Sequence, residues 1–138
     1  MAKSALTAIL WTGGIATLVI VVMHLALGSA SIPGAGPVSP TVDGEDRFYA
    51  VIFGGYGFAL IYCAKDVATR RSTIQLLAGL FMAGGVARAV SWILVGRPHR
   101  FFIVMLALEL VLPMVIWALQ KKVARDVAQD GLPQTGEF

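Results

Sequence analysis

The chain has 138 residues, of which 57% are hydrophobic and 14% are charged, and its net charge is only +3. About 25% of the residues in an ordinary soluble domain are charged, so this composition excludes that class and indicates an integral membrane protein. It also provides no soluble basic domain, and we therefore expect no binding to nucleic acid.

The apolar residues fall into four blocks, each long enough to cross a hydrocarbon core of about 30 Å as a helix. We therefore predict an all-α fold, an integral membrane four-helix bundle over residues 1–130, followed by a polar C-terminal tail over 131–138. The predicted helices cover about residues 5–27, 47–64, 73–95 and 101–119.

The first block, Ala5–Leu27, is 23 residues long and contains His24 about one turn from its end. The apolar core of a secretory signal has about 7–15 residues, so we expect this block to be kept as a membrane helix. The segment 28–46 that follows is rich in proline and glycine, which predicts an irregular loop.

The second block follows the acidic cluster Asp43, Glu45 and Asp46, residue types that favour a helix N-terminus. Its single cysteine, Cys63, is expected to pack as a small apolar side chain. The third and fourth blocks are joined by the short turn 96–100, which predicts an antiparallel hairpin. The first two blocks form the other hairpin, and the fourth helix is expected to continue as a polar extension through Asp126.

Positive charge predicts the orientation, because cytoplasmic segments of membrane proteins are enriched in Lys and Arg. Seven basic residues lie on the side of the N-terminus and three on the other, so both termini are predicted to be cytoplasmic. The seven are Lys3, Lys65, Arg70, Arg71, Lys121, Lys122 and Arg125, and the three are Arg47, Arg97 and Arg100.

Two charged residues stand inside apolar blocks. Arg88 precedes Gly96 by eight residues and Glu109 follows Phe101 by eight, so at ~1.5 Å per residue both lie roughly 12 Å from the outer ends of their helices. An isolated charge at such a depth costs at least ~2.5–3.5 kcal/mol, so each is expected to face the bundle interior and find a partner. The pair is either a purely structural ion pair, aided by close helix approach at Gly84 and Gly85, or part of a polar ligand pocket.

Three further side chains are candidates for that pocket. Tyr56 lies at the depth of the pair and has Glu109 as a possible hydrogen-bond partner. Ser91 shares a helix face with Arg88, and His24 would cover the pocket mouth if helix 1 packed against helix 3. The candidate ligand-binding residues are therefore Arg88, Glu109, Tyr56, His24 and Ser91.

No catalytic residue, metal site or cofactor is predicted. His24, Cys63 and His99 fall at different depths, so they do not converge as metal ligands. Neither a phosphate-binding glycine loop nor a nucleophile elbow is present. We therefore favour a protein that is not an enzyme.

Four motifs resemble one family of small bacterial four-helix membrane proteins, known only as a domain of unknown function and similar in outline to DoxX-like proteins. They are the run 24–28, the loop Ile32-Pro33-Gly34, the segment 43–49, and the pair Arg88 with Ser91. The resemblance ends near Leu119. It implies a four-helix fold in the bacterial inner membrane, and it carries no established activity.

Three functions remain open at this point. The first is binding of a lipid or other small amphipathic ligand in a polar pocket in the outer half of the bundle. The second is a small accessory or assembly subunit of a larger membrane complex, with a structural Arg88–Glu109 pair, and the third is a small transporter. The expected partners are membrane lipids, with a larger membrane complex or a homo-oligomer as further possibilities.

Overall fold

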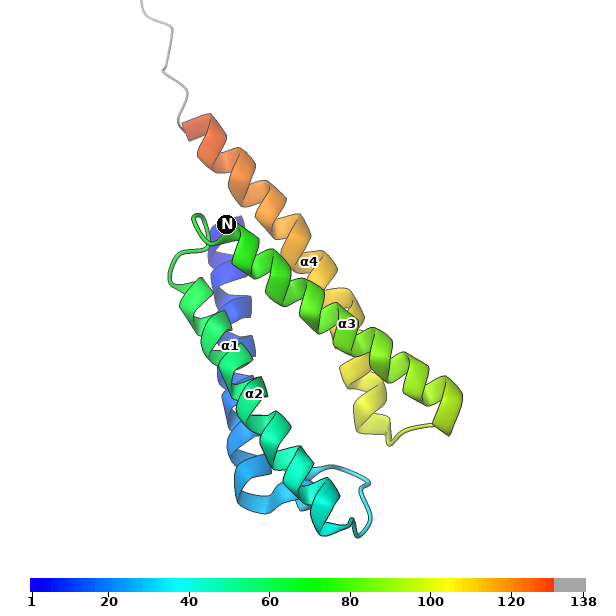
Figure 1. Ribbon diagram of the computed structural model, residues 1–138. Helices are drawn as coiled ribbons and strands as arrows, with labels where there is room; N and C mark the ends of the chain where they lie inside the picture. The colour runs from blue at the N-terminus through cyan, green and yellow to red at the C-terminus, as the bar shows by residue number, and fades with distance from the viewer. Residues whose placement is uncertain (131–138) are drawn as a thin grey trace, which may run out of the picture.

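The computed structural model describes residues 1–130, so the predicted polar tail over 131–138 lies outside the described residues. The described part contains four α-helices and one short 3-10 helix (Figure 1). All four α-helices are long and apolar enough to cross a membrane, as the sequence predicts. The elements are α1 (Ala2–Leu27), η1 (Gly28–Ser31), α2 (Pro40–Ala64), α3 (Arg71–Val95) and α4 (Arg100–Asp130).

α2 begins at Pro40, well before the start near Arg47 that the sequence suggested. The hydroxyl of Ser39 caps the helix by accepting a hydrogen bond from the Val42 N–H at 3.3 Å, and Pro40 occupies the first turn, where a missing N–H is harmless. The acidic cluster therefore lies within α2, and the irregular loop is reduced to residues 32–39.

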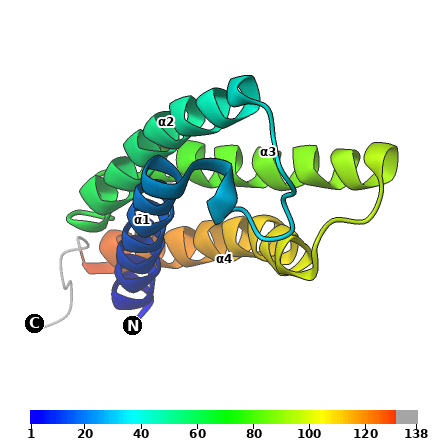
Figure 2. The same cartoon turned by 90° about the horizontal axis from the view of Figure 1, so that it is seen from below.

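The helices pack mainly in two pairs, α1 with α2 and α3 with α4 (Figures 1 and 2). Glycines allow the first pair to approach closely, because a β-carbon at Gly14 would stand 2.9 Å from the carbonyl oxygen of Gly57. A β-carbon at Gly57 would in turn stand 3.0 Å from the methyl group of Thr17. Both glycines are thus used for packing inside the chain.

The apolar core lies at one end of the molecule, which we call the core end. It is built from the beginning of α1, the end of α2, the beginning of α3 and the second half of α4. Cys63 belongs to it and is fully buried, which confirms the packing role predicted for this residue.

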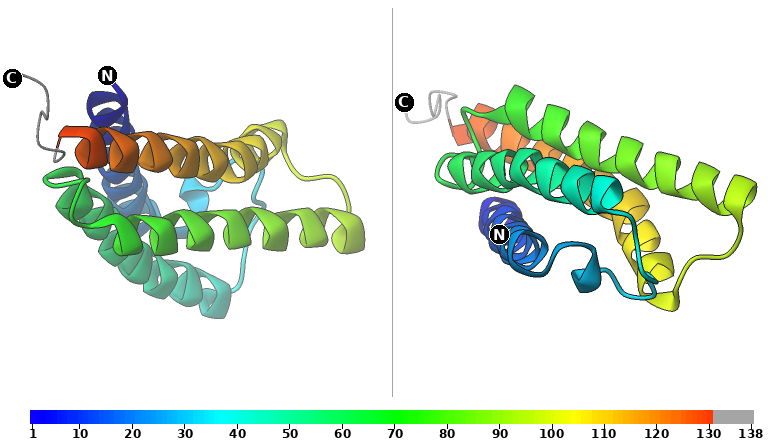
Figure 3. Two further views of the ribbon diagram at one scale, coloured as in Figure 1. Left: turned by 90° about the horizontal axis from the view of Figure 1, so that it is seen from above. Right: turned by 60° about the horizontal axis from the view of Figure 1, so that its bottom comes forward.

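The opposite end, which we call the loop end, carries the loop 32–39 and the α3–α4 connection 96–99. Here the two helix pairs diverge, and the loop reaches from one pair toward the other (Figure 3). Gly34 marks this contact, because a β-carbon at that position would lie 3.0 Å from the β-carbon of His99.

Between the pairs, α1 packs against α4 and α2 against α3, whereas α1 makes no packing contact with α3 in the described residues. The condition under which His24 would cover the mouth of a pocket beside α3 is therefore not met. α1 packs mainly against α2, to which it is joined by the short segment 28–39.

Candidate functional site

Arg88 of α3 and Glu109 of α4 form the ion pair that the sequence predicts. The guanidinium donates two parallel hydrogen bonds, from Nε to Oε2 and from Nη2 to Oε1, each 2.9 Å long. This two-point geometry is the strongest form of the arginine–carboxylate contact. Both charges are therefore held in one orientation.

Gly85 explains why the two helices come close enough for this contact. A β-carbon there would lie 2.9 Å from the β-carbon of Glu109 and 3.1 Å from a methyl group of Leu110. At Gly84, by contrast, an added β-carbon would meet no atom of residues 1–130 within 4 Å. Of the two glycines that the sequence suggested for close approach, only Gly85 serves it.

The aromatic ring of Phe102 completes the environment of Arg88. The guanidinium carbon lies 5.1 Å from the ring centroid, within the range of a cation–π contact. Phe102 lies about two turns before Glu109 on α4, so one helix supplies both the carboxylate and the ring.

The two partners differ in exposure. The Glu109 side chain is only 10% exposed, whereas the Arg88 side chain remains 36% exposed. The two hydrogen bonds use Nε and Nη2 of Arg88, so its Nη1 remains able to donate to a further acceptor. Glu109 thus orients a guanidinium that still has donor capacity.

Tyr56 does not bond to Glu109, which the sequence had offered as a candidate partner. Its hydroxyl donates to the carbonyl oxygen of Leu77 on α3 at 3.0 Å, and its ring stacks with those of Phe53 and Phe81. Tyr56 therefore joins α2 to α3.

His24 belongs to a separate polar cluster at the loop end of α1 and α2. Its Nδ1 lies 2.9 Å from a carboxylate oxygen of Asp46. Beside it, Asp43 accepts hydrogen bonds from the Ser29 backbone N–H and from Nε of Arg47, both at 2.9 Å. Arg47 also donates to the carbonyl oxygen of Leu25.

This second cluster was not predicted as a unit. The spacing of Asp43 and Arg47, four residues apart on one helix, was a usable signal, but Asp43 had been assigned to the region before the helix. Ser91, the remaining predicted site residue, is exposed one turn beyond Arg88 on α3.

The predicted site residues other than Ser91 therefore fall into three contacts that each join two helices. His24 joins α1 to α2, Tyr56 joins α2 to α3, and Arg88 with Glu109 joins α3 to α4. The last contact leaves a charged group partly exposed along the apolar length of the helices. No group of three or more potential metal ligands converges within residues 1–130.

Gln120, which the sequence analysis did not single out, is a buried polar residue at the core end. It is 2% exposed, and its Nε2 donates to the carbonyl oxygen of Arg71 at 3.3 Å. Its Oε1 accepts no hydrogen bond from the part of the chain that the structure describes. Gln120 lines a hollow of about 200 Å³ between α4 on one side and the α2–α3 connection with the first residue of α3 on the other. A larger hollow of about 530 Å³ lies between α4 and the beginning of α1.

Residues 5–120 match the family model described as a domain of unknown function, DUF4345. The chain belongs to the DUF4345 family. No curated protein and no solved structure matches it. The match to DUF4345 extends over parts of all four helices and includes both Arg88 and Glu109, but its description assigns no activity.

Proposed function

We propose that the chain is a non-enzymatic protein of the bacterial inner membrane that binds the polar head of a lipid or other small amphipathic molecule through Arg88. In this proposal the helices form two antiparallel hairpins with both termini in the cytoplasm, an outline shared with DoxX-like proteins. The excess of basic residues at the core end, seven against three, supports that orientation.

The observation that carries the proposal is the unequal exposure of the ion pair. A pair that only locked two helices together would be best served by burying both partners, since an exposed charge in the bilayer is costly. Arg88 instead keeps 36% of its side chain exposed while Glu109 keeps 10%. An anionic or carbonyl oxygen from a bilayer molecule would satisfy Nη1 at that depth.

Each neighbour has a defined part in this proposal. Glu109 fixes the guanidinium by two hydrogen bonds, Gly85 brings the helices together, and Phe102 supports the cation through its ring face. Ser91, exposed one turn beyond Arg88 on α3, could contact the ligand head. Tyr56 and His24 keep the helices in place through their own partners.

The test is native mass spectrometry of the full chain in a mild detergent with oleate as the probe and oleyl alcohol as the matched neutral control. Hydrogen bonds to charged groups contribute about 1.5–3 kcal/mol, so we expect oleate to be retained at least about tenfold more strongly than the alcohol. Arg88→Gln is expected to remove this difference, whereas Arg97→Gln, in the α3–α4 connection, is expected to leave it unchanged. Equal retention of oleate by the parent and by Arg88→Gln would refute the proposal.

A second function, a small accessory subunit of a membrane complex, is favoured by one observation. Three separate polar contacts each join a different pair of neighbouring helices, as expected of a rigid scaffold. In that case Arg88→Met combined with Glu109→Leu would leave co-purifying partners unchanged and oleate retention would not depend on Arg88. Cross-linking in native membranes that recovers this chain alone would argue against it.

A further inference from the structure

The hollow between α4 and the α2–α3 connection is lined by a buried polar side chain whose hydrogen-bonding capacity is only half used within residues 1–130. Gln120 is 2% exposed and lines this hollow of about 200 Å³, and its side-chain oxygen Oε1 accepts no hydrogen bond from the described residues. From this arrangement we infer that the hollow binds an uncharged amphiphile with a hydroxyl group, whose O–H donates to Oε1 of Gln120.

The first step is to identify the unsatisfied atom as the oxygen of the Gln120 amide. The other end of the amide lies 3.3 Å from the carbonyl oxygen of Arg71, and only an N–H group can donate to a carbonyl. The amide nitrogen therefore faces Arg71 and the oxygen is left over. A buried acceptor without a donor costs free energy, so a ligand that supplies the donor gains affinity from it.

The second step concerns access to this oxygen. The hydrogen bond to Arg71, at 3.3 Å, is longer than the usual ~2.9–3.0 Å of an N–H···O bond, so it holds the amide weakly. The terminal torsion of a glutamine side chain has broad energy minima. Rotation of the amide about this torsion can therefore expose Oε1 to the hollow that Gln120 lines.

The third step is the chemical class of the ligand. Apart from Gln120 and Arg71, the lining is valine and alanine, which favours a ligand that is otherwise apolar. These apolar residues are Val67, Ala68, Val123, Ala124 and Val127.

Arg71 is the single charged residue of this lining, and it is exposed, so water already solvates its charge. An ammonium group would have to leave water for a neutral acceptor next to this like charge, which is unfavourable. A hydroxyl is an uncharged donor with a lower cost of desolvation. It is therefore the donor that fits Gln120.

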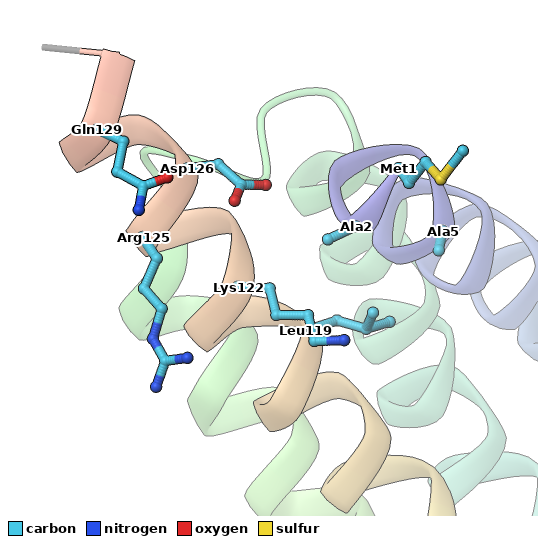
Figure 4. Close-up of a pocket in the computed structure, with 8 residues that line it drawn as sticks. All are labelled: Met1, Ala2, Ala5, Leu119, Lys122, Arg125, Asp126 and Gln129. Carbon is cyan, nitrogen blue, oxygen red and sulfur yellow. The ribbon is translucent and has the colours of Figure 1, made fainter.

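The larger hollow between α4 and α1 provides no comparable signal. Figure 4 shows its charged side chains Lys122, Arg125 and Asp126 on α4, and all three residues are exposed, so water satisfies them. Gln120 differs because it is buried, and it directly follows Leu119 at the end of the apolar stretch of α4. Hydroxyl groups of membrane amphiphiles lie at this boundary between hydrocarbon and headgroups.

The test uses the full chain in a mild detergent with decyl glyceryl ether as the probe. The matched control is the dimethyl ether of the same compound, which keeps the chain and the oxygens but has no O–H donor. Native mass spectrometry measures the ratio of probe to control that the protein retains. We expect Gln120→Met to lower this ratio about two- to tenfold, the effect of one net hydrogen bond between uncharged groups.

Two further variants assign the ratio to this hollow. Gln129→Met changes an exposed glutamine outside the lining and should leave the ratio at the parent value. Ala68→Leu fills the hollow without altering Gln120 and should weaken retention of the probe, so the inference can still be tested if Gln120→Met does not fold.

An isotope label in the side-chain carbonyl carbon of glutamine gives a direct NMR readout in micelles. We expect the Gln120 signal, assigned as the one lost in Gln120→Met, to shift saturably with the probe and to stay in place with the dimethyl ether. A ratio unchanged by Gln120→Met, or a Gln120 signal that the probe does not move because water alone serves Oε1, would overturn the inference. Since Arg88 takes no part, Arg88→Gln should leave both readouts unchanged, and failure here leaves the oleate test unaffected.

Discussion

Gly85 of α3 lies directly against Glu109 of α4, so that a β-carbon at position 85 would stand 2.9 Å from the β-carbon of Glu109. This approach brings Arg88, one turn further along α3, into two-point contact with the carboxylate. The absence of a β-carbon at Gly85 thus allows the helix approach on which the Arg88–Glu109 ion pair depends.

Gly85→Ala is therefore expected to force α3 and α4 apart and to lower the free energy of unfolding by about 1–3 kcal/mol, as for overpacked sites. Gly84→Ala is the matched control, because an added β-carbon there meets no described atom within 4 Å. It is expected to be neutral or to stabilise by up to about 1 kcal/mol through helix propensity. Reversible unfolding in mixed micelles measures both, and equal effects would contradict the close approach at Gly85.

Removing one member of the ion pair should lower the free energy of unfolding more than removing both members. Arg88→Met leaves the Glu109 carboxyl group without its partner in a site where its side chain is 10% exposed, and breaking a buried ion pair by removing one partner costs about 3–5 kcal/mol. Glu109→Leu should lower the free energy of unfolding by less than Arg88→Met does. The Arg88 side chain is already 36% exposed, and its long aliphatic part lets the guanidinium move toward water. The double variant is expected to approach the parent in stability.

A double-mutant cycle on unfolding free energies tests this order. If the two single losses simply add in the double variant, the two charges do not interact in the folded protein, and the assignment of the pair fails.

Tyr56→Phe should weaken the contact between α2 and α3. The change removes the hydrogen bond to the Leu77 carbonyl and is expected to lower the unfolding free energy by about 0.5–1.5 kcal/mol. Tyr49→Phe, at a position that is 62% exposed, controls for loss of a hydroxyl group. Hydrogen exchange should increase near Tyr56 and Leu77 in the first variant alone; unchanged exchange there would count against the contact.

The α2–α3 connection contains Asp66, an acidic residue through which the stability of the fold should depend on pH. Hydrogen bonds from the hydroxyl and the N–H of Thr69 hold the pKa of Asp66 below its usual value of 3.8. Because the folded-state pKa is the lower one, this interaction stabilises the fold above the unfolded-state pKa and is lost as the pH falls through the folded-state pKa.

Thr69→Val removes the hydroxyl, so the pKa of Asp66 should rise toward 3.8 and acid destabilisation should begin at a higher pH. Thr69→Ser keeps the hydroxyl and should behave like the parent. Carboxyl-carbon NMR titration in micelles reports the pKa directly. An identical Asp66 titration in the parent and in Thr69→Val would show that the hydroxyl has no influence.

The four long apolar helices and the Arg88–Glu109 contact could be predicted because each leaves a strong pattern in the sequence. Long apolar blocks identify the helices, and equal distances from a short turn place the two charges at one depth. The acidic cluster does not mark the beginning of α2, because the capping pair Ser39-Pro40 starts the helix before it.

The partner of Tyr56 could not be found from sequence, since its acceptor is a backbone carbonyl and every residue carries one. The contact between His24 and Asp46 depends on α1 packing against α2 in one particular register. That register is set by Gly14 and Gly57, whose close approach only the three-dimensional structure reveals.

The most direct test of the proposed role of Arg88 uses Trp92, which lies one turn beyond it on α3 and is half-buried. With Trp11 and Trp117 replaced by Phe, quenching of the remaining tryptophan by dibrominated stearate in vesicles reports binding beside the guanidinium. We expect saturable quenching that Arg88→Gln weakens about tenfold, in line with loss of a charged hydrogen bond, while Arg97→Gln preserves it. Quenching that is linear in the fatty acid concentration and identical in the parent and in Arg88→Gln would contradict a binding role for Arg88.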